Sequence, residues 1–176
     1  MSFDTCTVSV TSRGDAEWIL LRPLVYEGAR DTFIVPSGFT TDFATIPRIL
    51  RWLVGRTGSH TRAVVLHDWL VSTGIDSGAV THRDADALFR RVLRETGTPL
   101  LLRWLMWSGV RLGSLAGGRR DGWWRDAPAV LAITVAAAPL VVPPTMLAAL
   151  ASAVHFAAER VVELGERIWL RLFRRR

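Results

Sequence analysis

The chain contains no lysine, asparagine or glutamine, so all 22 of its basic residues are arginines. The codons of these three absent amino acids are A-rich, and their joint absence is typical of a GC-rich genome. Part of the arginine content therefore reflects coding bias, which weakens the inference from the net charge of +6 to nucleic-acid binding. The single cysteine, Cys6, excludes an intrachain disulfide and a zinc site built from cysteines. The N-terminus lacks a basic region followed by an apolar run, so we expect no secretory signal peptide.

Acidic residues and arginines are both absent from residues 127–158. This stretch of 32 residues exceeds the roughly 20 apolar residues that cross a bilayer core. The tryptophans and arginines of residues 119–126 are residue types that the membrane interface prefers. Three prolines, at positions 139, 143 and 144, predict either a kinked helix or a re-entrant pair of short helices. We predict a membrane anchor at 127–158, with an Ala-rich hairpin packed on a soluble domain as the alternative.

The last segment, residues 159–176, predicts a basic amphipathic helix. Val161, Leu164 and Ile168 share one face at helical spacing, and arginines lie opposite. Such a helix suits an anionic lipid surface. Because the arginines lie beside apolar sequence and not among aromatic base-stacking residues, we expect membrane lipids as partners and no specific nucleic acid.

The remainder predicts an α+β fold in one globular domain, residues 1–118, followed by a Gly/Arg/Trp linker at 119–126. Residues rich in β-branched and aromatic side chains predict a small antiparallel sheet, and Gly-containing turns separate its strands. A helical hairpin and a third helix follow, with a brief helix before them. The strands are expected at 7–10, 18–21, 24–26 and 32–35, and the helices at 49–54, 61–71, 83–93 and 100–112.

A histidine and an aspartate, His67 and Asp68, interrupt an apolar helical run. His67 shares the face of the buried residues Ala63, Leu66 and Leu70, and Asp68 lies at the edge of that face. A polar pair held against a core costs free energy unless it is hydrogen-bonded or used for function. The pattern therefore indicates a reaction or ligand centre, or alternatively a buried hydrogen bond that only holds the fold together.

Asp86 falls on the inward face of the second predicted helix. If the two helices form an antiparallel hairpin turning near residues 75–78, Asp86 comes within about one turn of His67. A carboxylate opposite an inward histidine fixes its tautomer and raises its basicity. We therefore predict His67 and Asp86 as catalytic residues, with Asp84 as a solvated acid in the first helical turn.

Residues 35–48 form a loop dense in glycine, proline and hydroxyl side chains around Asp42. Asp42 either pins this loop or directs its carboxylate toward His67. Asp42 and Asp68 are candidate oxygen ligands for a divalent cation such as calcium. A metal site formed by both together with His67 and Asp86 is a further possibility, although zinc would prefer more nitrogen or sulfur ligands.

Several spaced motifs within residues 20–113 resemble a domain-of-unknown-function family carried by tailed phages and prophages. The motifs are Val35-Pro36-x-Gly38-Phe39-x-Thr41-Asp42-x-Ala44-Thr45-x-Pro47-Arg48, His67-Asp68-x-Leu70, Ala85-Asp86-x-x-Phe89 and Val110-Arg111-Leu112-Gly113. The resemblance implies a phage or prophage origin, brings no established activity, and marks Thr45 and Arg48 as further site candidates. The family usually has serine at the position of Thr45, so a serine-type nucleophile is disfavoured there.

The His-Asp pair also has a weaker likeness to phospholipase A2-type enzymes. That likeness implies a base role for His67, calcium binding for Asp68 and an orienting role for Asp86. The chain departs from those enzymes in lacking disulfides and a glycine-rich calcium loop, and in having Val71 where they have tyrosine. The sequence thus predicts a membrane-associated phage-type hydrolase that acts on lipid or another envelope component. The alternative is a non-catalytic phage structural or lysis-accessory protein, with phage proteins as partners and a place in the virion.

Overall fold

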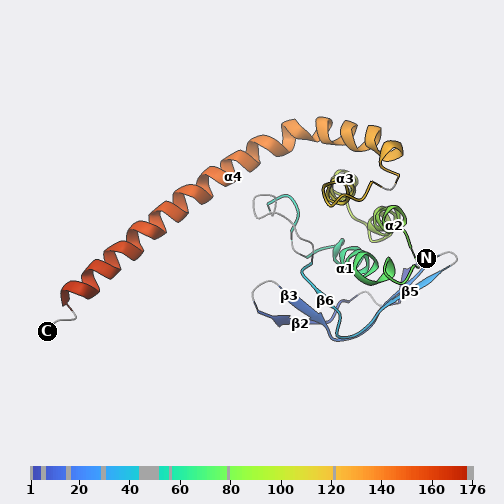
Figure 1. Cartoon of the computed structure of the whole chain (residues 1–176), viewed down its shortest axis with the longest axis horizontal. Coiled ribbons are helices and arrows are strands. Elements are labelled where there is room, and N and C mark those ends of the chain that lie inside the picture. Colours follow the sequence, from blue (N-terminus) through green and yellow to red (C-terminus); the bar gives the residue numbers. More distant parts are fainter. Residues whose placement is uncertain are drawn as a thin grey trace.

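The computed structural model describes residues 2–4, 7–14, 17–28, 31–43, 52–55, 57–78, 80–120 and 122–173, without the side chains of the last two. The fold is α+β, as predicted. Figure 1 shows the strands on one side of α1, with α2, α3 and the first part of α4 stacked in that order on the other side.

The strands form two three-stranded antiparallel sheets where one was expected. One sheet has the order β1-β4-β5 and the other β2-β3-β6. Their bounds are β1 Ser2–Phe3, β2 Val10–Arg13, β3 Glu17–Leu20, β4 Leu24–Glu27, β5 Thr32–Val35 and β6 Thr40–Thr41. The strand predicted at 7–10 was wrong in position, because Val10 is the residue that pairs with Leu20 and the pairing continues to Arg13 and Glu17.

The predicted helical hairpin is present. Helix α1 covers Thr61–Trp69 and continues directly into η2, a π-helical turn over Leu70–Gly74, while α2 covers His82–Glu95. His60 is the N-cap of α1 and makes no side-chain cap hydrogen bond. At the start of α2, Thr81 and Asp84 form a capping box that satisfies backbone groups of the first turn.

Helix α3 spans Leu100–Ala116, so it begins where predicted and ends four residues later than predicted. Pro99 occupies its N-cap position. The buried face of α3 carries polar residues as well as Trp107, namely Ser108, Arg111 and Ser114. This polar part of the buried face of α3 contributes to the site described below.

Helix α4 is continuous from Trp123 to Phe173 and contains Pro128, Pro139, Pro143 and Pro144. The re-entrant pair was therefore wrong, and α4 instead bends in its orange segment, which contains three of the prolines (Figure 1). Its first turn lies inside the expected linker, and the predicted basic helix is its C-terminal continuation.

One core links both sheets to α1 and α2. Its fully buried members include Leu20, Leu24 and Val35 from the sheets, Leu66 from α1 and Val92 from α2. Since burying a leucine or valine side chain contributes about 1.5–3 kcal/mol, this core fixes α1 against α2 and thereby sets the distance between His67 and Asp86. The brief helix expected at 49–54 lies partly outside the described residues, and residues 52–54 form a turn.

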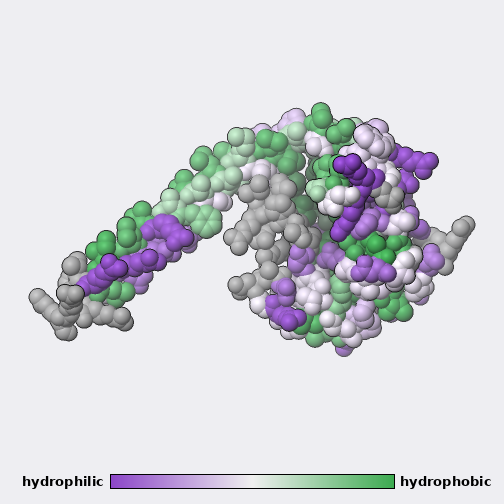
Figure 2. Space-filling view, viewed as in Figure 1, coloured by the Kyte–Doolittle hydropathy of each residue, from purple (hydrophilic) through white to green (hydrophobic). Residues whose placement is uncertain are grey.

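Among the described residues, one helix is long and apolar enough to cross a membrane. It covers Trp123–Arg171, and only 11% of its most apolar 18-residue window is buried. Figure 2 shows the apolar surface continuing along α4 away from the rest of the chain. Leu147 and Val154, for example, are 68% and 62% exposed. Length, composition and exposure are thus compatible with membrane association.

Candidate functional site

The site centres on a short contact between α1 and α2. His67 Nε2 lies 2.8 Å from Asp86 Oδ1, and their side chains are 12% and 1% exposed. The imidazole ring also packs on Phe89, with ring centroids 4.7 Å apart. The predicted encounter of His67 and Asp86 across the helical hairpin is therefore present in the structure.

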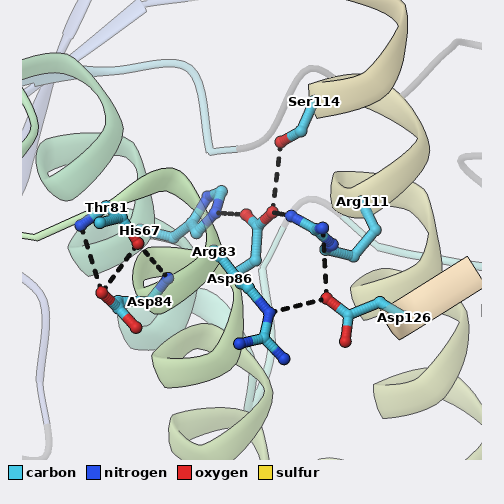
Figure 3. Close-up of polar contacts among 8 residues, drawn as sticks. All are labelled: His67, Thr81, Arg83, Asp84, Asp86, Arg111, Ser114 and Asp126. Atoms are coloured by element: carbon cyan, nitrogen blue, oxygen red, sulfur yellow. Dashed lines mark hydrogen bonds and ion pairs between the residues drawn. The ribbon is translucent and has the colours of Figure 1, made fainter. Parts of the chain in front are cut away.

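The other carboxylate oxygen of Asp86 connects to α3. Asp86 Oδ2 accepts hydrogen bonds from Arg111 Nη1 at 3.0 Å and from Ser114 Oγ at 3.2 Å. Arg111 is 1% exposed and continues to Asp126 through a contact of 3.2 Å between Nη2 and Oδ2. Arg83 Nε lies 3.4 Å from the same oxygen of Asp126 (Figure 3). A buried chain of polar groups thus runs from His67 through Asp86 and Arg111 to the first turn of α4.

These contacts decide the protonation state of Asp86. Burial alone would raise the pKa of Asp86, but the hydrogen bond and charge of His67, together with the Arg111 guanidinium, outweigh burial and lower that pKa. Asp86 is therefore ionised at neutral pH and acts only as a hydrogen-bond acceptor. In neutral His67 the proton consequently lies on Nε2, and Nδ1 keeps its lone pair. A histidine in this tautomer can accept a proton at Nδ1.

His67 lines a cleft of about 430 Å³ between the β2-β3-β6 sheet and α1 with its π-helical extension. Asp42, Asp68 and Thr41 line the same cleft. The further lining residues are Glu17, Phe39, Thr40, Val71 and Ser72. The structure thus brings the predicted residues His67, Asp68 and Asp42 to one cleft, while Asp86 lies behind His67 in the core.

Thr41 fixes the carboxylate of Asp68. Its Oγ1 donates to Asp68 Oδ2 at 2.6 Å and accepts from the backbone N–H of Phe43 at 3.1 Å. Phe43 has a φ of 55°, a left-handed conformation that is uncommon for a residue other than glycine. Strained backbone of this kind is concentrated at functional sites, and here it lies directly after Asp42.

Asp68 has an unusual ionisation. Burial raises its pKa to about 6, although the hydrogen bond from Thr41 and the nearby His67 oppose that rise and Asp42 adds to it. An acid with a pKa near 6 is partly protonated close to neutral pH. Asp68 can therefore donate or accept a proton under conditions in which Asp86 stays ionised.

Replacing Asp68 by asparagine is expected to increase stability at pH 7 by about 1–3 kcal/mol. The folded pKa of about 6 exceeds the ordinary value of 3.8, so the folded state binds more protons between these pH values. Stability of the wild type therefore falls as pH rises through this window, and Asp68→Asn removes the dependence. Urea unfolding of both proteins at pH 4, 5, 6 and 7 measures how the free energy of unfolding changes with pH. An equal change in the wild type and in Asp68→Asn would contradict the raised pKa of Asp68. Asp86, with a lowered pKa, changes stability only below this window.

Asp42 and Asp68 stay a prediction as cation ligands. Among the described residues, no group of three or more His, Cys, Asp or Glu side chains is arranged to hold a metal ion. Asp86 directs both oxygens to protein donors, and Asp68 is held by Thr41. Asp42 and Asp68 share the cleft without completing a ligand set. Two other predicted residues, Thr45 and Arg48, lie outside the described residues.

Sequence reasoning missed Arg111, Ser114 and Asp126 as members of the site. The signal for the first two was available, because Trp107, Arg111 and Ser114 recur at i, i+4 and i+7 in a helix that is otherwise largely apolar. An arginine on the buried stripe of such a helix requires a buried partner. No comparable pattern identified Asp126, since its contact depends on how α4 packs on α3.

Comparison with known proteins gives one match. The model of a family described as "Protein of unknown function (DUF1353)" matches residues 18–110, more than half of the chain. His67, Asp68, Asp42 and Asp86 lie inside the matched region, and Arg111 lies just after it. No curated protein and no solved structure matches the chain.

Proposed function

Because the chain belongs to the DUF1353 family of proteins of unknown function, we propose its activity from the site itself: a membrane-associated hydrolase whose general base is His67. One observation carries the proposal. An imidazole that lines a cleft is held through Nε2 by a buried, ionised Asp86, which leaves Nδ1 to accept a proton. Positioned general bases of this kind accelerate reactions by about 10²–10⁴-fold.

In the proposed reaction His67 Nδ1 takes a proton from water, and the water oxygen bonds to the carbonyl carbon of an ester or amide. The bond from that carbon to the leaving oxygen or nitrogen then breaks, and the proton passes from His67 to the leaving group. Asp86 stabilises the imidazolium that forms in between, while Arg111 and Ser114 hold Asp86 in place. Asp68, with a pKa of about 6, supplies a second proton-transfer group in the cleft.

The exposed apolar surface of α4 supports a substrate at the membrane. Between Pro139 and Phe156 most of the large apolar side chains are exposed, as Leu140, Met146 and Leu150 are at 62%, 67% and 63%. A face of this kind marks an interaction surface, and its length fits a bilayer. We therefore propose lipid or another envelope component as the substrate class. A phage or prophage origin rests on the motif resemblance alone.

The complete hydrogen bonding of the Asp86 carboxylate favours one alternative function. Its two oxygens are hydrogen-bonded to His67, Arg111 and Ser114, an arrangement that also suits a scaffold. In that case the chain is a non-catalytic structural or lysis-accessory protein of a phage, and the cleft performs no chemistry.

Full-length protein in a non-ionic detergent is expected to hydrolyse one of three substrates: anionic phospholipid, zwitterionic phospholipid or purified cell-wall sacculi. Each is assayed with calcium and with a chelator, by released fatty acid or soluble wall fragments. Because the described residues hold no group of three or more His, Cys, Asp or Glu side chains arranged for a metal ion, turnover should persist in the chelator. Absence of product from every substrate under both conditions would overturn the hydrolase proposal.

A further inference from the structure

A pocket of about 380 Å³ between α2 and α3 is lined mainly by arginines. Arg90, Arg91 and Arg94 come from α2 and Arg103 from α3, with Ala87 and Trp104 completing the lining. None of the described residues that line it is acidic. Guanidinium groups bind phosphate through paired N–H donors, so this pocket is suited to a phosphate-bearing ligand.

Neighbouring contacts hold parts of this pocket in place. The guanidinium of Arg90 lies 4.8 Å from the ring centre of Trp104 and 4.9 Å from that of Trp107. Arg91 Nε contacts Glu95 Oε1 at 3.0 Å, so one carboxylate offsets part of the positive charge. The pocket therefore keeps a positive excess that complements an anion.

An apolar groove of about 460 Å³ lies beside the arginine pocket and shares Trp104 with it. The groove lies between α3 and α4. Leu100, Leu101 and Trp104 line it from α3, and Ala129, Ala132, Ile133, Ala136 and Ala137 line it from α4. Leu100 and Leu101 are 62% and 50% exposed, which is costly for two adjacent leucines in water unless a ligand covers them.

We propose that the arginine pocket and the apolar groove form one binding site for an anionic phospholipid. The phosphate lies among the arginines, an acyl chain lies in the groove, and Trp104 contacts both parts, as tryptophans do at the membrane interface. The start of the apolar helix α4 forms one side of the groove. The site would therefore encounter an anionic phospholipid wherever α4 enters a bilayer.

This lipid site is separate from the His67 cleft, because the two share no lining residue. The inference rests on the proposed membrane association but not on hydrolysis. Its occupant is accordingly a bound lipid that holds α2, α3 and α4 together, and not the proposed substrate in the cleft.

Thermal unfolding of the full chain in non-ionic micelles tests the site. Added phosphatidylglycerol is expected to raise Tm by about 5 °C, because a ligand that binds only the folded state stabilises it. Phosphatidylcholine and inorganic phosphate should each give less than half of that shift. The double variant Arg94→Ala/Arg103→Ala should lose the response, while Arg13→Ala/Arg22→Ala, which removes two exposed arginines elsewhere, should keep it.

The groove has its own variant, Ala136→Phe, which fills it without touching the arginines. Loss of the phosphatidylglycerol shift in Ala136→Phe supports the acyl-chain part of the site. An equal shift with phosphatidylcholine, an unchanged shift in Arg94→Ala/Arg103→Ala, or full reproduction of the shift by inorganic phosphate would each overturn the proposal. These outcomes are independent of catalysis, so they are distinguishable from a failure of the hydrolase proposal.

Discussion

Replacing Asp86 by alanine is expected to lower the free energy of unfolding by about 3–5 kcal/mol, because it removes one member of a buried ion pair. Asp86 and Arg111 are each 1% exposed and lie 3.0 Å apart. Without Asp86, Arg111 loses one buried carboxylate while its contact with Asp126 remains, and Ser114 and His67 lose an acceptor. Urea unfolding of the purified variant measures the loss, and Asp4→Ala, at an exposed position, is the matched control.

A second substitution separates charge burial from lost packing. In Asp86→Ala/Arg111→Met both charges are gone and the methionine replaces the arginine stem, so about half or more of the lost stability should return. Asp126→Ala should cost less than Asp86→Ala, because Asp126 is 18% exposed and Arg111 then keeps Asp86. A double variant that is as unstable as Asp86→Ala would contradict the role given to this ion pair.

Replacing His67 by alanine is expected to lower turnover of the hydrolysed substrate by about 10²–10⁴-fold, the usual contribution of a general base. The effect on folding should be much smaller than for Asp86, since His67 lies at the rim of the core with 12% of its side chain exposed. However, the variant leaves Asp86 without one hydrogen-bond donor. A loss of about 1–2 kcal/mol is therefore expected alongside the loss of turnover.

Two controls accompany this variant. His155→Ala removes a histidine that is 70% exposed on α4 and should leave both turnover and Tm unchanged. His67→Gln keeps a side chain able to hydrogen-bond Asp86 but cannot act as a base, so it should recover stability without recovering turnover. If His67→Gln were as active as the wild type, the side chain would have a positioning or structural role only.

The encounter of His67 with Asp86 could be predicted because it depends on local rules. Helical periodicity placed both side chains on inward faces, and the short connection forced α1 and α2 into an antiparallel pair. The capping box of Thr81 and Asp84 was predictable for the same reason, since it involves residues three positions apart.

Contacts between distant elements could not be predicted in this way. The bond from Thr41 to Asp68 joins β6 to α1, and the pair of Arg111 with Asp126 depends on the packing of α4. The bounds of the strands also depend on their pairing register, because two-residue strands such as β6 have no periodicity to detect. The choice between one kinked helix and a re-entrant pair likewise follows no local propensity rule, since proline interrupts isolated helices in water.

The most direct test of His67 as the general base is rescue of His67→Ala by added imidazole, measured as the initial rate of hydrolysis by the full chain. A free base that enters the space left by the ring should restore part of the lost rate. It should do so more strongly as pH rises past the imidazole pKa, with no effect on the wild type. A His67→Ala protein that hydrolyses the substrate as fast as the wild type without imidazole would contradict the account.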